Sequence, residues 1–309
     1  MTRIVVTGAA GLVGQNLIAR LKADPAMRII GIDKHPANTA ALRRLHPEIE
    51  VIAADLAVAG PWIEAFREAD AVVQLHAQIG GLDWREFEAN NIKATGNVLA
   101  AMTAAQVPYL VHVSSSVVNS QAVDFYTESK KAQEKLVVEA GIPHATLRPT
   151  LMFGWFDRKH LGWLARFMKR VPVFPIPGSG RYMRQPLYAL DFCDVIVACL
   201  RSRREGAWNI SGLEKLDYID LMRAVKRATG AGTPIVRIPC GLFRLLLQGY
   251  ALVDRNPPFT TRQLAALVTP DSFEIIDWPG IFGVRPTPLD EALHATFNDP
   301  TYSGVALEF

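Results

Sequence analysis

A turn with three evenly spaced glycines, near the start of the chain, constrains the fold more than any other feature. Gly8, Gly11 and Gly14 follow an apolar run at residues 3–7, and apolar residues at helical spacing begin within this turn, at Leu12. Small residues there let a strand turn sharply into a helix and let a ligand approach the bare backbone. The free N–H groups of the first helical turn favour a phosphate. The turn therefore predicts a unit that holds the pyrophosphate of a dinucleotide, although a merely tight turn is the alternative.

Further apolar runs alternate with helical patterns along the first half of the chain. The predicted helices cover residues 84–105 and 125–140, and the predicted strands after the first lie at residues 28–33, 50–53, 71–75, 109–113 and 144–148. Such alternation is typical of a parallel sheet with helices on both faces, which binds ligands at the carboxyl ends of its strands. We therefore predict an α/β fold, a doubly wound parallel sheet, for residues 1–150.

The pattern becomes irregular after residue 150, where prolines accumulate. Residues 151–184 and 213–309 are predicted to form a small α/β cap that binds the substrate, whereas residues 185–212, with one helix and one strand, are expected to return to the sheet. Residues 241–253 are strongly apolar. They are too few to span a membrane, so we expect a helix that covers other elements. Two short helical patterns follow, near Thr261 and Pro288.

An aspartate ends the second predicted strand, nearly 20 residues beyond the glycine turn. Asp33 is placed to accept hydrogen bonds from the hydroxyls of the adenosine ribose, which favours NAD over NADP. A strand-end or capping aspartate is the alternative. Lys34 and His35 weaken the preference for NAD, because a cation beside the acid attracts a 2′-phosphate.

Tyr126 and Lys130 are four residues apart on a predicted helix, so their side chains share one face. An ammonium beside a phenol favours the phenolate and is expected to lower the pKa of Tyr126 towards neutrality. Such a phenol can move a proton to or from a hydroxyl or carbonyl during hydride transfer. Because this spacing arises often by chance on solvated helices, the interpretation depends on the glycine turn and on the serine run at residues 114–116.

These motifs together resemble the extended short-chain dehydrogenase/reductase family, in its NAD-dependent epimerase/dehydratase group. The glycine turn and the Tyr126–Lys130 pair match the family's two signatures, over about residues 1–215. The resemblance implies a Rossmann-type fold with a substrate-binding cap. It implies catalytic roles for Ser116, Tyr126, Lys130 and Asn91, and cofactor contacts from Gly8, Gly11, Leu12, Val13, Gly14, Asp33, Asp55, Leu56, His76 and Lys130.

Two departures from the family pattern bear on the substrate site. His76 stands where the family has a small residue; it either borders the nicotinamide ribose or the substrate, or is a hydrogen-bonded structural histidine. Leu151 stands where nucleotide-sugar members often carry an asparagine, which weakens that assignment. Four arginines could meet a diphosphate, although surface ion pairs are their default: Arg148, Arg166, Arg181 and Arg184.

Composition limits the partners and the compartment. The net charge of +3 is too small and too evenly spread to indicate nucleic acid. Cys193, Cys199 and Cys240 lack metal-ligand spacing, and the first two lie in an apolar helical run, so we expect no metal and buried free thiols. No signal peptide or membrane-spanning run is recognisable, which predicts a cytoplasmic protein. The resemblance implies a homodimer through the helices at residues 84–105 and 125–140.

The leading hypothesis is an NAD(P)-dependent oxidoreductase that acts at a secondary alcohol or ketone, of a nucleotide sugar, as a 4-keto reductase or an epimerase. A reductase or dehydrogenase of a lipophilic, hydroxysteroid-like ketone is the alternative that Leu151 and residues 241–253 favour. A nucleotide-binding structural protein is the third hypothesis, and the retention of Ser116, Tyr126 and Lys130 argues against it. The irregular cap suggests an open cleft, which favours exchange of the cofactor in every cycle.

Overall fold

The computed structural model describes residues 1–120, 124–253, 264 and 274–308. Its centre is a seven-stranded sheet in which every pairing is parallel, in the order β11-β6-β5-β4-β1-β2-β3. The Rossmann-type fold predicted from the sequence is confirmed, and each predicted strand lies within one or two residues of an observed one. The strands of this sheet are β1 (Thr2–Thr7), β2 (Met27–Asp33), β3 (Glu50–Ala53), β4 (Ala71–Gln74), β5 (Leu110–Val113), β6 (His144–Pro149) and β11 (Gly206–Ile210).

The strand order reverses next to β1, and this reversal positions the ligand site. The chain runs outward from β1 through β2 to β3, and then crosses to β4 and continues in the other direction. A crevice opens at such a switch point, outside the carboxyl ends of the strands. Gly8 follows β1 and His76 lies just beyond β4, so the glycine turn borders this crevice.

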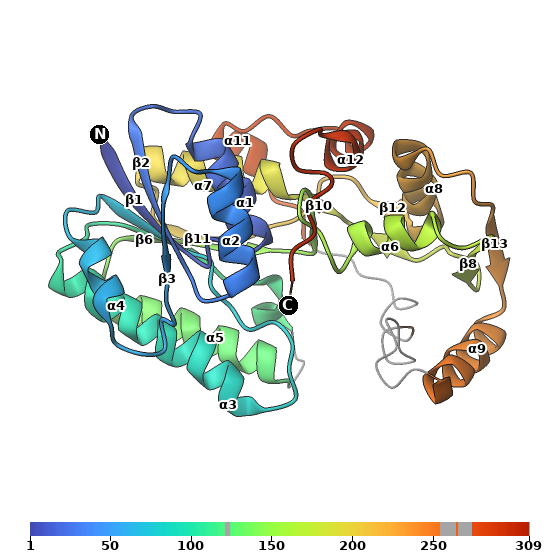
Figure 1. Ribbon diagram of the computed structural model, residues 1–309, viewed down its shortest axis with the longest axis horizontal. Helices are drawn as coiled ribbons and strands as arrows, with labels where there is room; N and C mark the ends of the chain where they lie inside the picture. The colour runs from blue at the N-terminus through green and yellow to red at the C-terminus, as the bar shows by residue number, and fades with distance from the viewer. Residues whose placement is uncertain (121–123, 254–263, 265–273, 309) are drawn as a thin grey trace.

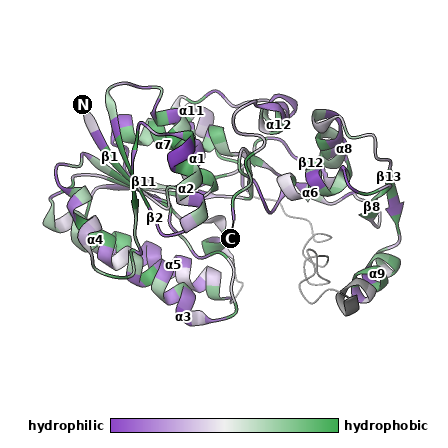
Figure 2. Cartoon of the chain, viewed as in Figure 1, coloured by the Kyte–Doolittle hydropathy of each residue, from purple (hydrophilic) through white to green (hydrophobic). Residues whose placement is uncertain are grey.

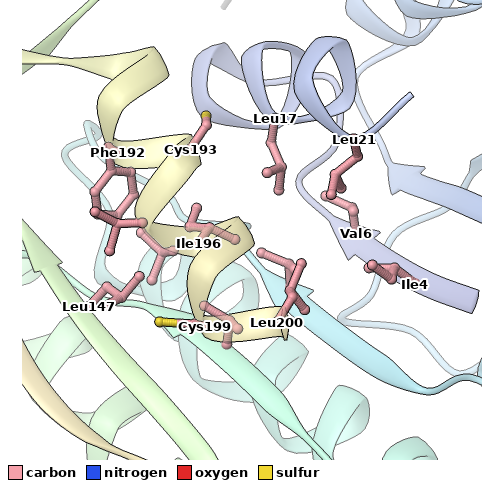
Figure 3. Close-up of a cluster of buried hydrophobic side chains, with 14 of the residues drawn as sticks. Ile4, Val6, Leu17, Leu21, Leu147, Phe192, Cys193, Ile196, Cys199 and Leu200 are labelled. Atoms are coloured by element: carbon pink, nitrogen blue, oxygen red, sulfur yellow. The ribbon is translucent and has the colours of Figure 1, made fainter. Parts of the chain in front are cut away.

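Helices cover both faces of the sheet (Figure 1). On one face α1 (Leu12–Leu21) packs against α7 (Ala189–Ser202), and Figure 3 shows side chains of β1, α1 and α7 in one cluster, next to Leu147. The same cluster includes α11 (Trp278–Phe282), so part of the predicted cap packs on the sheet. Leu42 of α2 (Pro36–Leu45) also belongs to it. The other face carries α4 (Ala94–Ala104) and α5 (Phe125–Glu139).

The helix predicted at residues 84–105 is interrupted. It consists of α3 (Trp84–Phe87), a π-helical turn (Glu88–Lys93) and α4. A π-helical turn contains more residues per turn than an α-helix and is frequent at functional sites. Here it carries the buried Asn91, whose side chain bonds two other segments of the site.

The cap has a hydrophobic core of its own, formed around Met168, Ile176, Met222 and Leu293. Its strands pair two by two, as β10-β7, β12-β9 and β13-β8. Its elements are β7 (Met152–Phe153), α6 (Leu161–Met168), β8 (Phe174–Pro177), β9 (Met183–Arg184), β10 (Leu187–Tyr188), β12 (Leu216–Asp217), α8 (Tyr218–Thr229), β13 (Ile235–Ile238), α9 (Cys240–Val253) and α12 (Leu289–Asn298).

The apolar run at residues 241–253 forms α9, but its leucines are not buried. The helix lies at the end of the cap and is largely hydrophobic (Figure 2), yet Leu242, Leu245 and Leu246 are exposed. The expectation of a covering helix is therefore wrong for its described side chains. The pattern near Thr261 lies outside the described residues, whereas the pattern near Pro288 forms α12. In the described part of the chain, no helix is both long and apolar enough to cross a membrane.

Candidate active site

Each glycine of the turn after β1 has its own structural reason. Gly8 has a φ of +70°, and a Cβ atom there would lie 2.6 Å from the backbone nitrogen of His76. A Cβ on Gly14 would lie 2.5 Å from the carbonyl oxygens of Gly8 and Ala9. The helix can therefore pack this closely against the turn only with glycine at position 14. A Cβ on Gly11 would meet only the Gly8 carbonyl oxygen, at 3.4 Å. The backbone of Gly11 is thus open to the cavity beside it, which fits a pyrophosphate.

One cavity of about 620 Å³ lies at the carboxyl edge of the sheet and extends towards the cap. It brings together nearly all the residues predicted for the site, from segments far apart in the sequence. Asn91 is the one predicted residue that does not line it. The predicted residues that do are Gly8, Gly11, Leu12, Val13, Gly14, Asp33, Asp55, Leu56, His76, Ser116, Tyr126 and Lys130.

The acids at the end of β2 and beyond β3 are fixed by local hydrogen bonds. The Asp33 carboxylate accepts from the backbone N–H groups of Ala10 and His35, both at 3.0 Å, which ties β2 to the glycine turn. Lys34 turns away from Asp33, because its ammonium bonds the carboxylate of Asp55, at 3.4 Å, and the side chain of Asn90. Lys34, one of the two residues that weakened the prediction of NAD, therefore forms its ion pair with Asp55 in this conformation.

A buried chain of hydrogen bonds runs from the helix of the predicted catalytic pair to the glycine turn. The Lys130 ammonium bonds the Gln133 amide oxygen at 2.6 Å, and the Gln133 amide donates to the Thr95 hydroxyl at 2.8 Å. Thr95 contacts Nε2 of His76 at 3.4 Å, and Nδ1 of His76 contacts the hydroxyl of Thr7 at 2.8 Å. Lys130 is thus connected, through the side chains of Gln133, Thr95 and His76, to Thr7, the residue before Gly8.

His76 is a neutral member of this chain. Thr95 accepts from two amides, those of Gln133 and Gln74, so its single proton points to Nε2 of the imidazole. The proton of His76 is therefore on Nδ1 and is donated to Thr7. Burial, together with the charges of Lys130 and Lys34, lowers the pKa of His76 to about 3. His76 is hydrogen-bonded, as its structural alternative predicted, and it also lines the cavity.

The pKa relation expected for Tyr126 and Lys130 is wrong for this conformation. Burial raises the pKa of Tyr126, and a hydrogen bond from the Ser115 side chain only partly opposes it. Lys130 does not compensate, because its ammonium bonds the Val113 carbonyl at 3.0 Å as well as Gln133. Burial lowers the pKa of Lys130 itself to about 7, against a smaller opposing effect of Glu134. Burial thus favours the neutral form of both side chains.

Ser115, one residue before the predicted Ser116, is the serine whose side chain favours the ionised form of Tyr126 and so lowers its pKa. A short 3-10 turn (Ser116–Asn119) begins directly after Ser115, and the Ser115 hydroxyl also accepts from the Val117 N–H at 3.4 Å. Ser116 lines the cavity but has no such contact with Tyr126 among the described interactions. Because residues 114–116 are all serines, the sequence alone does not show which of them lies beside Tyr126.

Asn91 acts between two parts of the site. Its amide donates to the Ser129 hydroxyl at 2.8 Å, and its oxygen accepts from the Gln78 N–H at 2.6 Å. Ser129 in turn donates to the Tyr126 carbonyl at 2.9 Å. Asn91 therefore fixes the loop after β4 against the helix that carries Tyr126.

Two hydroxyls that sequence reasoning missed also face the cavity. Ser114 and Thr150 follow β5 and β6, and both side chains are buried. Among the described residues, neither hydroxyl oxygen has a hydrogen-bond partner. A buried hydroxyl without a partner is costly, and a polar ligand would satisfy both groups.

None of the four arginines considered for a diphosphate lines the cavity. Arg148 forms a two-pronged ion pair with Glu134, at 2.9 and 2.7 Å, and does not line the cavity. Arg166, Arg181 and Arg184 do not line it either. Arg158, Lys159 and His160 do, next to Leu151 and Phe156. No group of three or more side chains suited to a metal ion occurs among the described residues.

Comparison with known sequences identifies the family. Residues 4–211 match the NAD dependent epimerase/dehydratase family. A 3 beta-hydroxysteroid dehydrogenase/Delta 5-->4-isomerase of Mycobacterium tuberculosis is 25% identical over 283 residues, which cover 80% of this chain and 75% of that protein. A 3-beta-hydroxysteroid dehydrogenase of Mycolicibacterium neoaurum is 23% identical over a region that covers 80% of this chain and 76% of that protein.

Solved structures share the fold. A UDP-glucuronic acid 4-epimerase from Bacillus cereus, in complex with NAD, superposes with a TM-score of 0.74 at 21% identity, covering 96% of this chain and 98% of that one. A UDP-N-acetylglucosamine 4-epimerase from Methanobrevibacter ruminantium gives 0.75 at 16% identity, over 96% of both chains. The family match covers the glycine turn, Tyr126 and Lys130. The chain belongs to the NAD-dependent epimerase/dehydratase family.

Proposed function

We propose that the protein is an NAD-dependent oxidoreductase that interconverts a secondary alcohol and a ketone, with Tyr126 as the acid and base. The observation that supports this most is the single cavity shared by the glycine turn, Asp33, Ser115, Tyr126 and Lys130. The glycine turn would hold the pyrophosphate, Asp33 the adenosine ribose, and the hydroxyls of Ser114 and Thr150 polar groups near the strand ends. A bound nicotinamide would supply or accept the hydride at the reacting carbon.

The side chains of Tyr126 and Ser115 would then take part in proton transfer to and from the reacting oxygen. Tyr126 in its neutral form can donate a proton to a developing alkoxide while Ser115 hydrogen-bonds the same oxygen. The reverse reaction needs the phenolate, which the raised pKa of Tyr126 disfavours. Movement of the Lys130 ammonium from the Val113 carbonyl towards the phenol would favour the phenolate. We infer that ligand binding draws Lys130 out of its bonds to Val113 and Gln133.

NAD is the proposed cofactor, rather than NADP. Asp33 lines the cavity and repels a 2′-phosphate, and Lys34 is engaged by Asp55. Structural neighbours were solved with NAD. Titration of the protein with NADH and NADPH tests this choice, and tighter binding of NADPH would contradict it.

A nucleotide sugar is the first substrate class proposed. Arg158 and Lys159 line the cap side of the cavity, where they could meet a diphosphate, and the structural neighbours include UDP-sugar 4-epimerases. A lipophilic ketone is the second candidate, because Leu151 is 47% exposed at the cavity and Phe156 lies beside it. The hydroxysteroid dehydrogenases among the sequence relatives support this second class.

Turnover by Tyr126→Phe is the test of the proposed chemistry. Wild-type protein is assayed with NAD and NADH against UDP-sugars, keto-sugars and steroid ketones, and the variant is assayed on whichever substrate turns over. The substitution keeps the ring and removes the proton, so turnover should fall about 10²- to 10⁴-fold while NADH binding persists. Near-normal turnover by the variant would exclude Tyr126 as the acid and base.

A further inference from the structure

A segment at the end of the described chain returns to the cofactor side of the molecule. Residues 302–308, which we call the strap, leave α12 and end beside α2 (Figure 1). The ring of Tyr302 lies 4.6 Å from that of Trp155 in the cap and 5.8 Å from that of His46, which ends α2. Tyr302 thus connects the start of the strap to the cap and to the C-terminal end of α2.

The strap is anchored a second time at the near end of α2. The side-chain amide of Asn38 donates to the Glu308 carbonyl at 2.8 Å, and the Asn38 oxygen accepts from the Glu308 N–H at 2.8 Å. Leu307 is only 5% exposed, and its carbonyl accepts from the Arg158 guanidinium at 3.1 Å. The strap therefore bonds the sheet domain through Asn38 and the cap through Arg158.

This second anchor lies at the cavity. Leu307, Glu308, Asn38 and Arg158 all line the same cavity as Asp33, the residue proposed to hold the adenosine ribose. Asp33 ends β2, and α2 begins three residues later. Residues of the sheet domain, the cap and the strap thus all border this end of the cavity.

We propose that the strap is a clasp over the adenosine end of the dinucleotide site, and that its opening limits how fast the dinucleotide leaves. The proposal rests on the proposed function, since it assigns the cavity to a dinucleotide. The bonds that hold the clasp are few, and Leu307 is its one buried side chain among residues 302–308. Such a segment can open without unfolding the sheet or the cap.

The test is the rate of NADH release, measured by stopped-flow fluorescence after a chase with excess NAD. A chain that ends at Gly304 lacks both bonds to Asn38 and the bond to Arg158, and Asn38→Ala removes the first two within the full chain. Asn38→Ala should speed release about tenfold, as expected for loss of two hydrogen bonds. The shortened chain should release NADH at least as fast as that variant, because it also loses the bond to Arg158 and the buried Leu307. Asn298→Ala is the matched control, because its amide also donates to backbone carbonyls, those of Ala228 and His294, away from the cavity.

The combined variant separates the clasp from a direct contact between Asn38 and the cofactor. If Asn38 acts through the strap, Asn38→Ala should add nothing in the chain that ends at Gly304. An added effect there, or equal release rates for the full and shortened chains, would overturn the clasp alone. Failure of the full chain to bind NADH and NAD would overturn the proposed function, and the clasp with it.

Discussion

Lys130 is buried in the site without a carboxylate bonded to its ammonium. Its side chain is 1% exposed, and its ammonium bonds an amide and a carbonyl rather than a carboxylate. Glu134, one turn further along α5, is engaged by Arg148. Burial without an acidic partner disfavours the charged amine, which lowers the pKa of Lys130 to about 7.

This cost makes stability depend on pH in a defined direction. Between the folded pKa of about 7 and an unfolded pKa of about 10.4, the unfolded chain binds more protons, so the free energy of unfolding rises with pH. The contribution of Lys130 is up to about 1.4 kcal/mol per pH unit. Urea unfolding of the ligand-free protein at pH 7, 8 and 9 should show a steeper rise for wild type than for Lys130→Met. Parallel curves would show that the buried amine is not the cause.

A pair of serine substitutions decides which hydroxyl serves Tyr126. The Ser115 side chain lowers the pKa of Tyr126, so Ser115→Ala should lower turnover about tenfold or more, with a smaller effect on NADH binding. Ser116→Ala should change turnover by less than about threefold, since one solvated hydroxyl contributes little. The reverse ranking would restore Ser116 to the role that the sequence predicted.

At the scale of elements, the junction of β1 and α1 is built around close backbone contacts. The carbonyl oxygens of Gly8 and Ala9 occupy the space where a side chain on Gly14 would begin. α1 then packs against α7, which carries the buried core shown in Figure 3. Displacement of α1 would therefore disturb both the proposed phosphate site and one face of the sheet.

Two glycine-to-alanine substitutions separate this contact from helix propensity. Gly14→Ala should lower the free energy of unfolding by about 3 kcal/mol or more, because its Cβ would lie 2.5 Å from rigid backbone. Gly96, inside α4, has no atom within 4 Å of its virtual Cβ, so Gly96→Ala should raise stability by about 0.5–1 kcal/mol. Urea unfolding measures both. A mild effect at Gly14 would mean that α1 shifts freely on the sheet.

The elements that local pattern controls could be predicted, whereas long-range contacts and rotamers could not. Strand periodicity and the glycine spacing predicted the sheet and the edge of the cavity, because both patterns involve residues that are close together in the sequence. The inward turn of Lys130 depends on Gln133 and Val113, and the choice of Ser115 depends on where a 3-10 turn begins. The bonds from Asn38 to Glu308 join residues 270 positions apart, which no local pattern contains.

At the scale of the whole molecule, the cavity lies where the sheet and the cap meet, and the strap connects the two. This arrangement bears on the choice between an epimerase and a net reductase. An epimerase must keep its nicotinamide while the keto intermediate turns over, whereas a reductase must exchange it in every cycle. The irregular cap sequence favoured an open cleft and exchange. The strap argues for retention, because it is bonded to both sides of the cavity at the proposed adenosine end.

Cofactor content of the purified protein distinguishes these modes without knowledge of the substrate. Protein prepared without added nucleotide is denatured, and the released NAD is assayed against the protein concentration. With the strap intact we expect NAD to approach one per chain, since release must wait for the clasp to open. The chain that ends at Gly304 should carry several-fold less, and Asn298→Ala should match wild type. A wild-type protein nearly free of NAD would instead favour a reductase that exchanges its cofactor, as the sequence suggested.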